Sequence, residues 1–252
     1  MNTLEALTQL NATSETLTEQ QRQELDENGF FIAYNVFTQE EYEAIGAAID
    51  ALQAVEGEQG GKEVHTEAGA PRLSNVLNKS TAFDPCLAIQ PLLASAHYLL
   101  GDEIQVHGFN ARDALPGQGH QRLHSDAPKH EPGDWHVVNS LILLDPYTEE
   151  NGPTRVVPGT HRTGERPQDI LDDPEAPYPG EIKVTAPAGA VVILNASVWH
   201  GGTQNVSGER RRVLHLSYTR RNLPQQLVQR EYVTPVLHDR MSSAHRYLLS
   251  ID

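Results

Sequence analysis

The sequence predicts a mostly β fold in which N-terminal helices support a double-sheet jelly roll. Helical patterns are confined to about residues 1–100, whereas short apolar and β-branched runs between turn clusters dominate about residues 101–220. No strand-like run in the second part is followed by a helical pattern, which disfavours a parallel βαβ sheet. Short antiparallel strands with long insertions are typical of a jelly roll instead.

The first hundred residues contain clear signals for where helices begin and end. Thr18 opens a sequence that resembles a capping box, which predicts a short helix through Glu27. A second capping box at Thr38 predicts an amphipathic helix that ends before Gly57. The other expectations are a frayed N-terminus over 1–17, a strand over 30–36, a mobile loop over 57–69, an extended segment over 72–77 and helical segments over 84–100.

The strand-like runs of the second part are separated by clusters of Gly, Pro, Asn and Ser. They cover residues 104–111, 137–144, 155–157, 182–185, 190–194 and 211–218. The insert Thr163–Gly180 holds four prolines and five acidic residues, and its length favours a lid or binding loop. We expect one domain, with helical support over about 1–100, the jelly-roll core over about 101–220 and a C-terminal extension over 221–252.

Composition excludes several classes of function. The formal net charge of −15 disfavours nucleic acid as a partner, because an acidic surface repels phosphate. No apolar run approaches the roughly 20 residues that a membrane span needs. A single cysteine, Cys86, and the absence of a secretion signal predict a cytoplasmic protein. A small molecule is therefore the expected partner.

A candidate metal site begins at His124 and Asp126. On an extended backbone residues two apart point to the same face, so the imidazole and the carboxylate can converge on one ion. His200, which lies 74 residues beyond Asp126, could complete the two-histidine, one-carboxylate set of non-haem iron oxygenases. Taken singly, the His-x-Asp triplet also fits a surface turn, and His200 also fits a histidine bonded to a backbone carbonyl.

Arg211 is a candidate anion-binding group for the same site, although taken singly it also fits a solvated edge arginine in the basic run Arg210–Arg212. If the strands on either side of residues 203–208 form a hairpin with an even-numbered loop, Arg211 faces the same side as His200. Arg210 and Arg212 then face the other side, whereas an odd loop or a bulge would reverse the choice. A buried guanidinium near a metal requires an anionic partner, and a dicarboxylate bound to that metal would provide one.

Three ordered segments resemble the phytanoyl-CoA dioxygenase family of Fe(II)- and 2-oxoglutarate-dependent oxygenases. They are Gln121-x-x-His124-x-Asp126, then Glu150-Asn-Gly-Pro-Thr-Arg-Val-Val-Pro-Gly-Thr-His161, then Trp199-His200-Gly-Gly-Thr-Gln-Asn205 followed by Arg211. The resemblance implies a double-stranded β-helix (jelly roll) core that uses Fe(II), 2-oxoglutarate and O2.

The resemblance also assigns roles to individual residues. It implies that His124, Asp126 and His200 hold iron and that Arg211 binds the C5 carboxylate of 2-oxoglutarate. Gln121, Thr154 and Arg72 match further positions that contact 2-oxoglutarate. Gly202 departs from the pattern, since some relatives place a serine there that holds the same carboxylate. Thr203 is the expected substitute.

The function that follows is oxidation of an unactivated C–H bond, by hydroxylation or desaturation, with succinate and CO2 as co-products. Because Asp126 occupies the position that a halogenase leaves free for halide, the sequence predicts no halogenation. Two alternatives stay open, a jelly-roll metal-binding or sensor protein without turnover and a zinc hydrolase that uses the same ligands. Family analogy suggests a small neutral or cationic metabolite as substrate. The remaining histidines of interest, His130, His136, His161 and His215, are expected to be exposed or structural.

Overall fold

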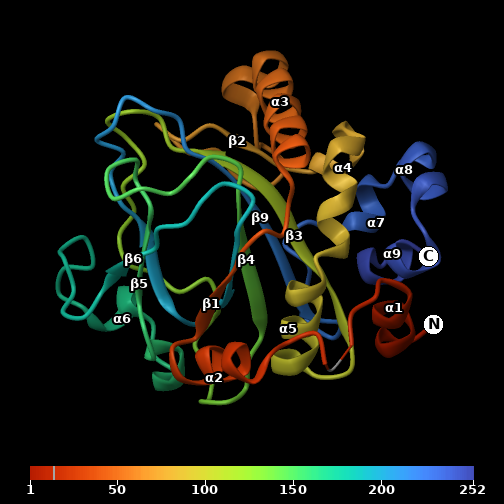
Figure 1. The fold of residues 1–252 in the computed structure, drawn as a ribbon, viewed down its shortest axis with the longest axis horizontal. Coiled ribbons are helices and arrows are strands. Elements are labelled where there is room, and N and C mark those ends of the chain that lie inside the picture. Colours follow the sequence, from red (N-terminus) through yellow and green to blue (C-terminus); the bar gives the residue numbers. More distant parts are fainter. Residues whose placement is uncertain (14) are drawn as a thin grey trace.

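The described residues of the computed structural model, 1–13 and 15–252, form two antiparallel sheets. The larger sheet has the order β1-β7-β4-β9-β3-β2, and the smaller has the order β6-β5-β8 (Figure 1). The strand bounds are β1 (Phe30–Ala33), β2 (Arg72–Leu73), β3 (Ile104–Asp113), β4 (Val137–Leu143), β5 (Thr154–Val157), β6 (Ile182–Lys183), β7 (Val191–Asn195), β8 (Trp199–Gly202) and β9 (Arg212–Arg220). Every pairing between named strands is antiparallel, which confirms the jelly roll expected from the sequence.

The large sheet separates an apolar core from a polar cavity. On β9, Leu214, Leu216 and Tyr218 pack into the hydrophobic cluster shared with the N-terminal helices. The alternate residues His215 and Ser217 line the cavity on the other face. Because successive side chains of a strand point to opposite faces, one strand can contribute to both regions.

The helices of the N-terminal part support this sheet. As expected, α2 (Glu19–Glu27) and α3 (Gln39–Glu56) begin at capping boxes, in which Thr18 and Thr38 accept hydrogen bonds from the third residue of each helix. α5 (Gln90–Leu100) contacts β3, β4, β7 and β9. The shorter helices are α1 (Thr3–Gln9), α4 (Val76–Lys79), α6 (Pro167–Ile170), α7 (Gln229–Tyr232), α8 (Pro235–Arg240) and α9 (Ser243–Leu249), and the 3-10 helices are η1 (Gly57–Gln59), η2 (Thr81–Ala88) and η3 (Thr160–Thr163). None of the described helices is long and apolar enough to cross a membrane.

The expected fraying of residues 1–17 is wrong for the described part of that segment, which excludes residue 14. Residues 3–9 form α1, and the Asn2 side chain caps its N-terminus. Ala6, Leu7 and Leu10 are buried, and α1 packs against α9 near the other end of the chain (Figure 1). These three residues form an apolar stripe at helical spacing, which the polar composition of the segment obscures.

Ion pairs tie the segment 57–69 to the sheet instead of leaving it free. Lys79 binds Glu56 and Glu63, and Glu67 binds Arg72 and Arg112. The extended segment expected over 72–77 is also shorter than predicted, because β2 has only two residues and α4 begins at Val76. The loop therefore carries Glu67 to the edge of the sheet.

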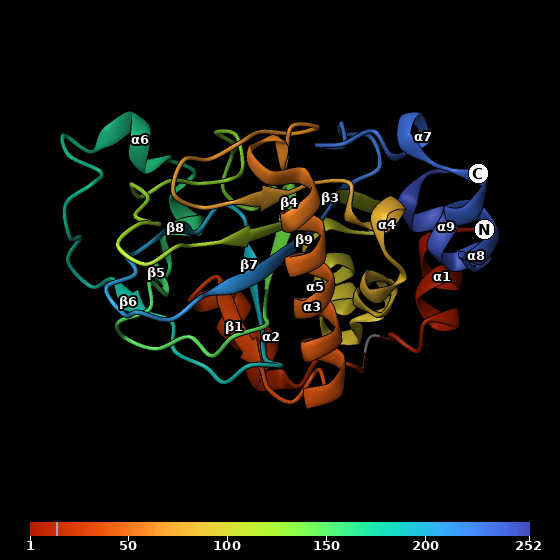
Figure 2. The ribbon, with the colours of Figure 1, turned by 90° about the horizontal axis from the view of Figure 1, so that it is seen from above.

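The insert Thr163–Gly180 is not a lid over the cavity, which corrects the expectation from its length. None of the described residues that line the cavity comes from this insert. Its backbone instead wraps the buried Arg155, which donates hydrogen bonds to the carbonyl oxygens of Pro174, Glu175 and Ala176. Figures 1 and 2 both place α6 at one end of the molecule, opposite α8 and α9.

Candidate active site

His124 and His200 lie side by side because their backbones pair. The amide of His124 donates to the carbonyl oxygen of His200 over 2.8 Å, and the reverse bond measures 3.0 Å. The amide of Asp126 donates to the carbonyl oxygen of Ala196 over 2.9 Å, which anchors the third residue to the turn before β8. One ligand atom from each of His124, Asp126 and His200 lies within 4.8 Å of the others, so three residues distant in the chain form one potential metal site.

The orientation of both imidazoles is set by a backbone carbonyl. Nδ1 of His124 donates to the carbonyl oxygen of Arg122 and Nδ1 of His200 to that of Val198, each over 2.9 Å. A carbonyl oxygen can only accept, so Nδ1 carries a proton and Nε2 is the nitrogen left to bind a metal. Each Nε2 faces the Asp126 carboxylate, at 3.6 Å for His124 and 3.4 Å for His200. This is the ring orientation that metal-binding histidines adopt.

The Asp126 carboxylate is held in its ionised form. Asn139 donates a hydrogen bond to its Oδ2 over 2.8 Å. Burial alone would raise the pKa of Asp126, but the imidazoles of His200 and His124 and the Asn139 amide together hold it well below its usual range. Two Nε2 atoms and an ionised carboxylate offer three donor atoms to one divalent cation, which would displace any proton held at Nε2.

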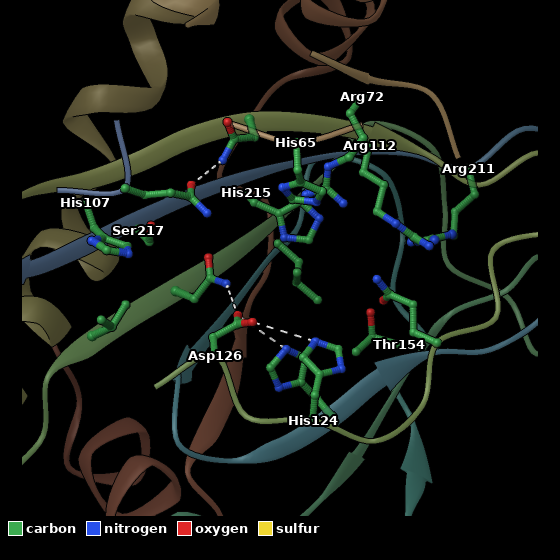
Figure 3. Close-up of a pocket in the computed structure, with 17 residues that line it drawn as sticks. His65, Arg72, His107, Arg112, His124, Asp126, Thr154, Arg211, His215 and Ser217 are labelled. Carbon is green, nitrogen blue, oxygen red and sulfur yellow. Dashed lines mark hydrogen bonds and ion pairs between the residues drawn. The ribbon is translucent and has the colours of Figure 1, made fainter. Parts of the chain in front are cut away.

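The three residues line a cavity of about 210 Å³ that also receives Arg211 (Figure 3). The Arg211 side chain is 1% exposed, and its guanidinium donates to the Tyr147 hydroxyl and lies over the Tyr147 ring. Within the described part of the chain, Nε and Nη2 of Arg211 are buried without a hydrogen-bond partner, and no carboxylate forms an ion pair with it. Burial also lowers the pKa of Arg211, because desolvation disfavours the charged guanidinium. The cavity thus contains a buried cation for which the described residues provide no anion.

Arg211 reaches the cavity by a different route from the expected hairpin. β8 belongs to the small sheet and β9 to the large one, so the segment 203–211 crosses between the two sheets. Arg211 precedes β9 and continues the cavity-facing series of His215 and Ser217. Arg210 and Arg212 point the other way, as expected, and bind acidic side chains, namely Asp50, Asp113 and Asp145.

The structure places the other predicted site residues, Gln121, Thr154 and Arg72, in the lining of the same cavity. Gln121 Oε1 accepts a hydrogen bond from the Gly202 amide over 3.1 Å. Thr154 starts β5 directly opposite Gly202. Arg72 lies on the edge strand β2 and already binds Glu67 over 2.6 Å.

Thr203 does not replace the serine that some relatives have at position 202. Its hydroxyl donates to the carbonyl oxygen of Pro153 over 2.7 Å, and it is absent from the cavity lining. A Cβ atom at Gly202 would lie 2.7 Å from the carbonyl oxygen of Gly119 and 3.4 Å from Nη1 of Arg112. The backbone therefore has no room for a serine, and the Arg112 guanidinium occupies the adjoining space.

We expect Gly202→Ser to destabilise the protein by about 1–3 kcal/mol, because overpacking forces backbone atoms apart. Gly208→Ser is the matched control, since a Cβ atom there has no neighbour within 4 Å. Urea denaturation of both variants measures the difference. Equal free energies of unfolding for the two variants would show that the Gly119 carbonyl can move aside.

Sequence reasoning missed several residues that line the cavity. His215 was expected to be a core residue, yet it faces the cavity, and its Nε2 is buried without a partner in the described structure. His130 and His136, by contrast, contact each other with tilted rings outside the lining, and His161 donates to the carbonyl oxygen of Asp26. The other missed lining residues are His65, His107, Asn110, Arg112, Val137, Asn139, Leu141, Ser217 and Gln226. Strict alternation along β3 and β9 could have indicated Asn110, Arg112, His215 and Ser217.

A comparison with known families identifies the chain. The phytanoyl-CoA dioxygenase (PhyH) family matches residues 25–213. The chain belongs to the phytanoyl-CoA dioxygenase family. This confirms the resemblance drawn from the three segments, all of which fall within the matched residues.

Individual relatives of the family share parts of the chain. Dioxygenase af480 of Aspergillus fumigatus is 33% identical over 49% of this chain and 40% of its own length. An ectoine dioxygenase of Bordetella bronchiseptica is 27% identical over 77% of this chain and 72% of its own length. L-proline trans-4-hydroxylase of Streptomyces griseoviridis is 31% identical over 51% of this chain and 59% of its own length. The match thus spans less than two thirds of the length of some of these relatives.

Solved structures share the fold at low sequence identity. HygX of Streptomyces hygroscopicus with nickel, 2-oxoglutarate and hygromycin B bound superposes with a TM-score of 0.64 at 16% identity, over 83% of this chain and 90% of that one. EctD of S. alaskensis with bound Fe gives a TM-score of 0.67 at 20% identity, over 84% of this chain and 80% of that one. The arrangement of the two sheets is therefore that of these proteins.

Proposed function

We propose that this chain is an Fe(II)- and 2-oxoglutarate-dependent dioxygenase that hydroxylates or desaturates an unactivated C–H bond of a small molecule, with succinate and CO2 as co-products. His124, Asp126 and His200 would hold the iron. Their donor set fits that ion, because two imidazole nitrogens and one ionised carboxylate lie within 4.8 Å of one another at the cavity wall. Hydroxylase and dioxygenase relatives support the reaction class.

The observation that carries the proposal is the unpaired Arg211. A buried guanidinium without an anion is costly, and an arginine fork binds a carboxylate in bidentate geometry. The C5 carboxylate of 2-oxoglutarate satisfies both requirements when its other end binds the metal. Thr154 and Gln121, which lie in the same lining, would flank that co-substrate.

The protein side chains have distinct tasks in this proposal. The iron, with 2-oxoglutarate and O2, supplies the oxidising chemistry, as cofactors do in general. Asp126 completes the metal site and leaves no ligand position for halide, so oxygenation or desaturation is expected in place of halogenation. Asn139 orients Asp126, and the carbonyl oxygens of Arg122 and Val198 orient the imidazoles.

The same observation separates this function from the two alternatives. A zinc hydrolase needs the three ligands and a water molecule but has no use for a buried guanidinium in the same cavity. A metal-binding protein without turnover would leave Arg211 without its anion. Neither alternative accounts for the buried cation, whereas the dioxygenase does.

Anaerobic titration of the purified protein with Fe(II) and then 2-oxoglutarate tests the proposal. We expect a visible charge-transfer band only when both are present, and we expect succinate to form when air is admitted. Zinc in place of Fe(II) is the control, because zinc has no redox chemistry and should give neither signal. Iron binding without the band on addition of 2-oxoglutarate would favour the metal-binding protein instead.

A further inference from the structure

The cavity has a second cationic group, separate from Arg211, on the edge strand of the large sheet. Arg72 and Arg112 are register partners on β2 and β3, and both bind the single carboxylate of Glu67. Arg112 makes bonds to both Glu67 oxygens, whereas Arg72 donates to one oxygen over 2.6 Å. No other hydrogen bond of the Arg72 guanidinium occurs within the described residues, although Arg72 lines the cavity.

The positive charge of the group formed by Arg72, Arg112 and Glu67 remains uncompensated when iron and 2-oxoglutarate are bound. Three arginines, Arg72, Arg112 and Arg211, face two carboxylates, Glu67 and Asp126, which leaves one positive charge. Desolvation raises the pKa of Glu67, but Arg112 and Arg72 outweigh it and lower the value to about 2, so Glu67 is ionised. Fe(II) and the 2-oxoglutarate dianion cancel each other. The filled site would therefore still contain one positive charge at Arg72 and Arg112.

Sheet geometry separates this charge from the one on Arg211. The strand order is β9-β3-β2, so the backbones that carry Arg211 and Arg72 are two strand spacings apart, roughly 10 Å. Arg112 lies on β3, between these two strands, and its Nη1 adjoins Gly202 at the end of the cavity proposed for 2-oxoglutarate. A carboxylate bound at Arg211 therefore leaves the Arg72 donors for a different anion.

The end of the cavity away from Arg211 is polar and uncharged. Ser217 on β9 lies six residues beyond Arg211, which directly precedes that strand, so an extended backbone separates the two by about 20 Å. Figure 3 shows Arg211 and Thr154 on one side of the cavity and His107 and Ser217 on the other, with His215 between them. Asn110 and His215 are register partners there, and Oδ1 of Asn110 and Nε2 of His215 are buried without partners within the described residues. Buried polar atoms of this kind call for a ligand that hydrogen-bonds to them.

We propose that the substrate is a small carboxylic acid that also carries a hydroxyl or amine donor, with its carboxylate bound by Arg72 and its donor bound by Asn110. This inference rests on the proposed function, because the charge count assumes bound iron and 2-oxoglutarate. It differs from the neutral or cationic metabolite suggested by family analogy. The acidic character of the whole chain does not describe this cavity, whose walls are positive. A buried arginine without a counter-ion favours the binding of an anionic substrate.

The inference reassigns Arg72 from the co-substrate to the substrate. Arg72 is therefore a specificity residue, and its replacement should leave 2-oxoglutarate binding intact. Glu67 has the opposite effect, because its carboxylate competes with the substrate carboxylate for the same guanidinium. Replacing Arg72 should therefore lower the affinity for the substrate acid, whereas replacing Glu67 should raise it.

Ligand-observed NMR on protein loaded with Ni(II) and 2-oxoglutarate tests the assignment without turnover. The probes are small hydroxy and amino acids and their primary amides, beginning with L-proline and L-prolinamide. We expect acids to bind about tenfold or more tightly than the matching amides, a difference of about 1.4 kcal/mol, because hydrogen bonds to charged groups are stronger than those between neutral groups. Arg72→Gln should remove this preference, and Glu67→Gln should strengthen acid binding. The control is Arg230→Gln, which replaces an exposed arginine that donates to the carbonyl oxygen of Asp252. It should change neither the affinity for acids nor their preference over amides.

The thermal shift caused by Ni(II) with 2-oxoglutarate, measured on the same proteins, separates two kinds of failure. If Ni(II) with 2-oxoglutarate causes no thermal shift in the wild type, both the proposed function and this inference are wrong. A normal shift with amides bound as tightly as acids, or with no acid bound better than its amide, overturns the inference alone. Loss of the 2-oxoglutarate shift in Arg72→Gln would return Arg72 to the co-substrate and also overturn it.

Discussion

Asp126→Gly is expected to reduce 2-oxoglutarate-dependent succinate formation by more than about 100-fold, since removing even an outer-shell partner of a metal ligand costs roughly 10–100-fold. The variant loses the only carboxylate of the triad. Two imidazoles alone do not make the three-donor face that Fe(II) prefers in oxygenases. The iron retained per chain after desalting, together with succinate release in air, measures the effect.

The matched control for this substitution is Asp172→Gly, which removes an exposed aspartate from the insert outside the cavity. It should retain iron and succinate formation at the wild-type level. Asp126→Gly loses the hydrogen bond from Asn139 as well, so circular dichroism and a melting curve accompany the assay. Undiminished succinate release by a folded Asp126→Gly variant would remove Asp126 from the ligand set.

Arg211→Met should stabilise the cofactor-free protein while it destroys 2-oxoglutarate binding. The guanidinium has two buried nitrogens without partners in the described structure, and each such donor costs about 1–3 kcal/mol. Methionine fills similar space without a charge, so we expect a higher free energy of unfolding. Loss of one partner of a buried ion pair costs about 3–5 kcal/mol, which corresponds to 2-oxoglutarate affinity lower by about 100-fold or more.

Two measurements on the same protein test these opposite signs. Urea denaturation without ligand gives the stability change, and titration with 2-oxoglutarate in the presence of Ni(II) gives the affinity change. Arg230→Met is the control for replacing an arginine and should leave the affinity unchanged. If Arg211→Met weakens folding and keeps 2-oxoglutarate affinity, Arg211 serves the packing around Tyr147 and not an anion.

Local signals in the sequence were sufficient for most secondary structure. The capping boxes at Thr18 and Thr38 start α2 and α3 because they depend only on residues three positions apart. The strands of the second part also lie close to their expected positions. The N-terminal helix α1 was missed because its buried apolar residues, Ala6 and Leu7, are few and their partner α9 lies at the other end of the chain.

Long-range contacts decided the composition of the cavity. The hairpin expected after His200 does not exist, because β8 and β9 belong to different sheets, even though Arg211 still reaches the cavity. Glu67 and Arg112 carry no local motif, and their ion pair joins residues 45 positions apart. The lid expected from the insert Thr163–Gly180 packs elsewhere because the buried Arg155 binds its carbonyl oxygens.

By itself, the sequence determined most of the helices and strands, the jelly-roll class and the three segments that resemble the phytanoyl-CoA dioxygenase family, because these depend on patterns within a few residues. Only the tertiary structure decided that His124 and His200 pair through their backbones and that Arg211 has no carboxylate partner among the described residues. It also decided that Arg72 and Arg112 share one carboxylate. Charge balance in a cavity is a sum over residues far apart in the chain, and folding alone brings them within reach of one another.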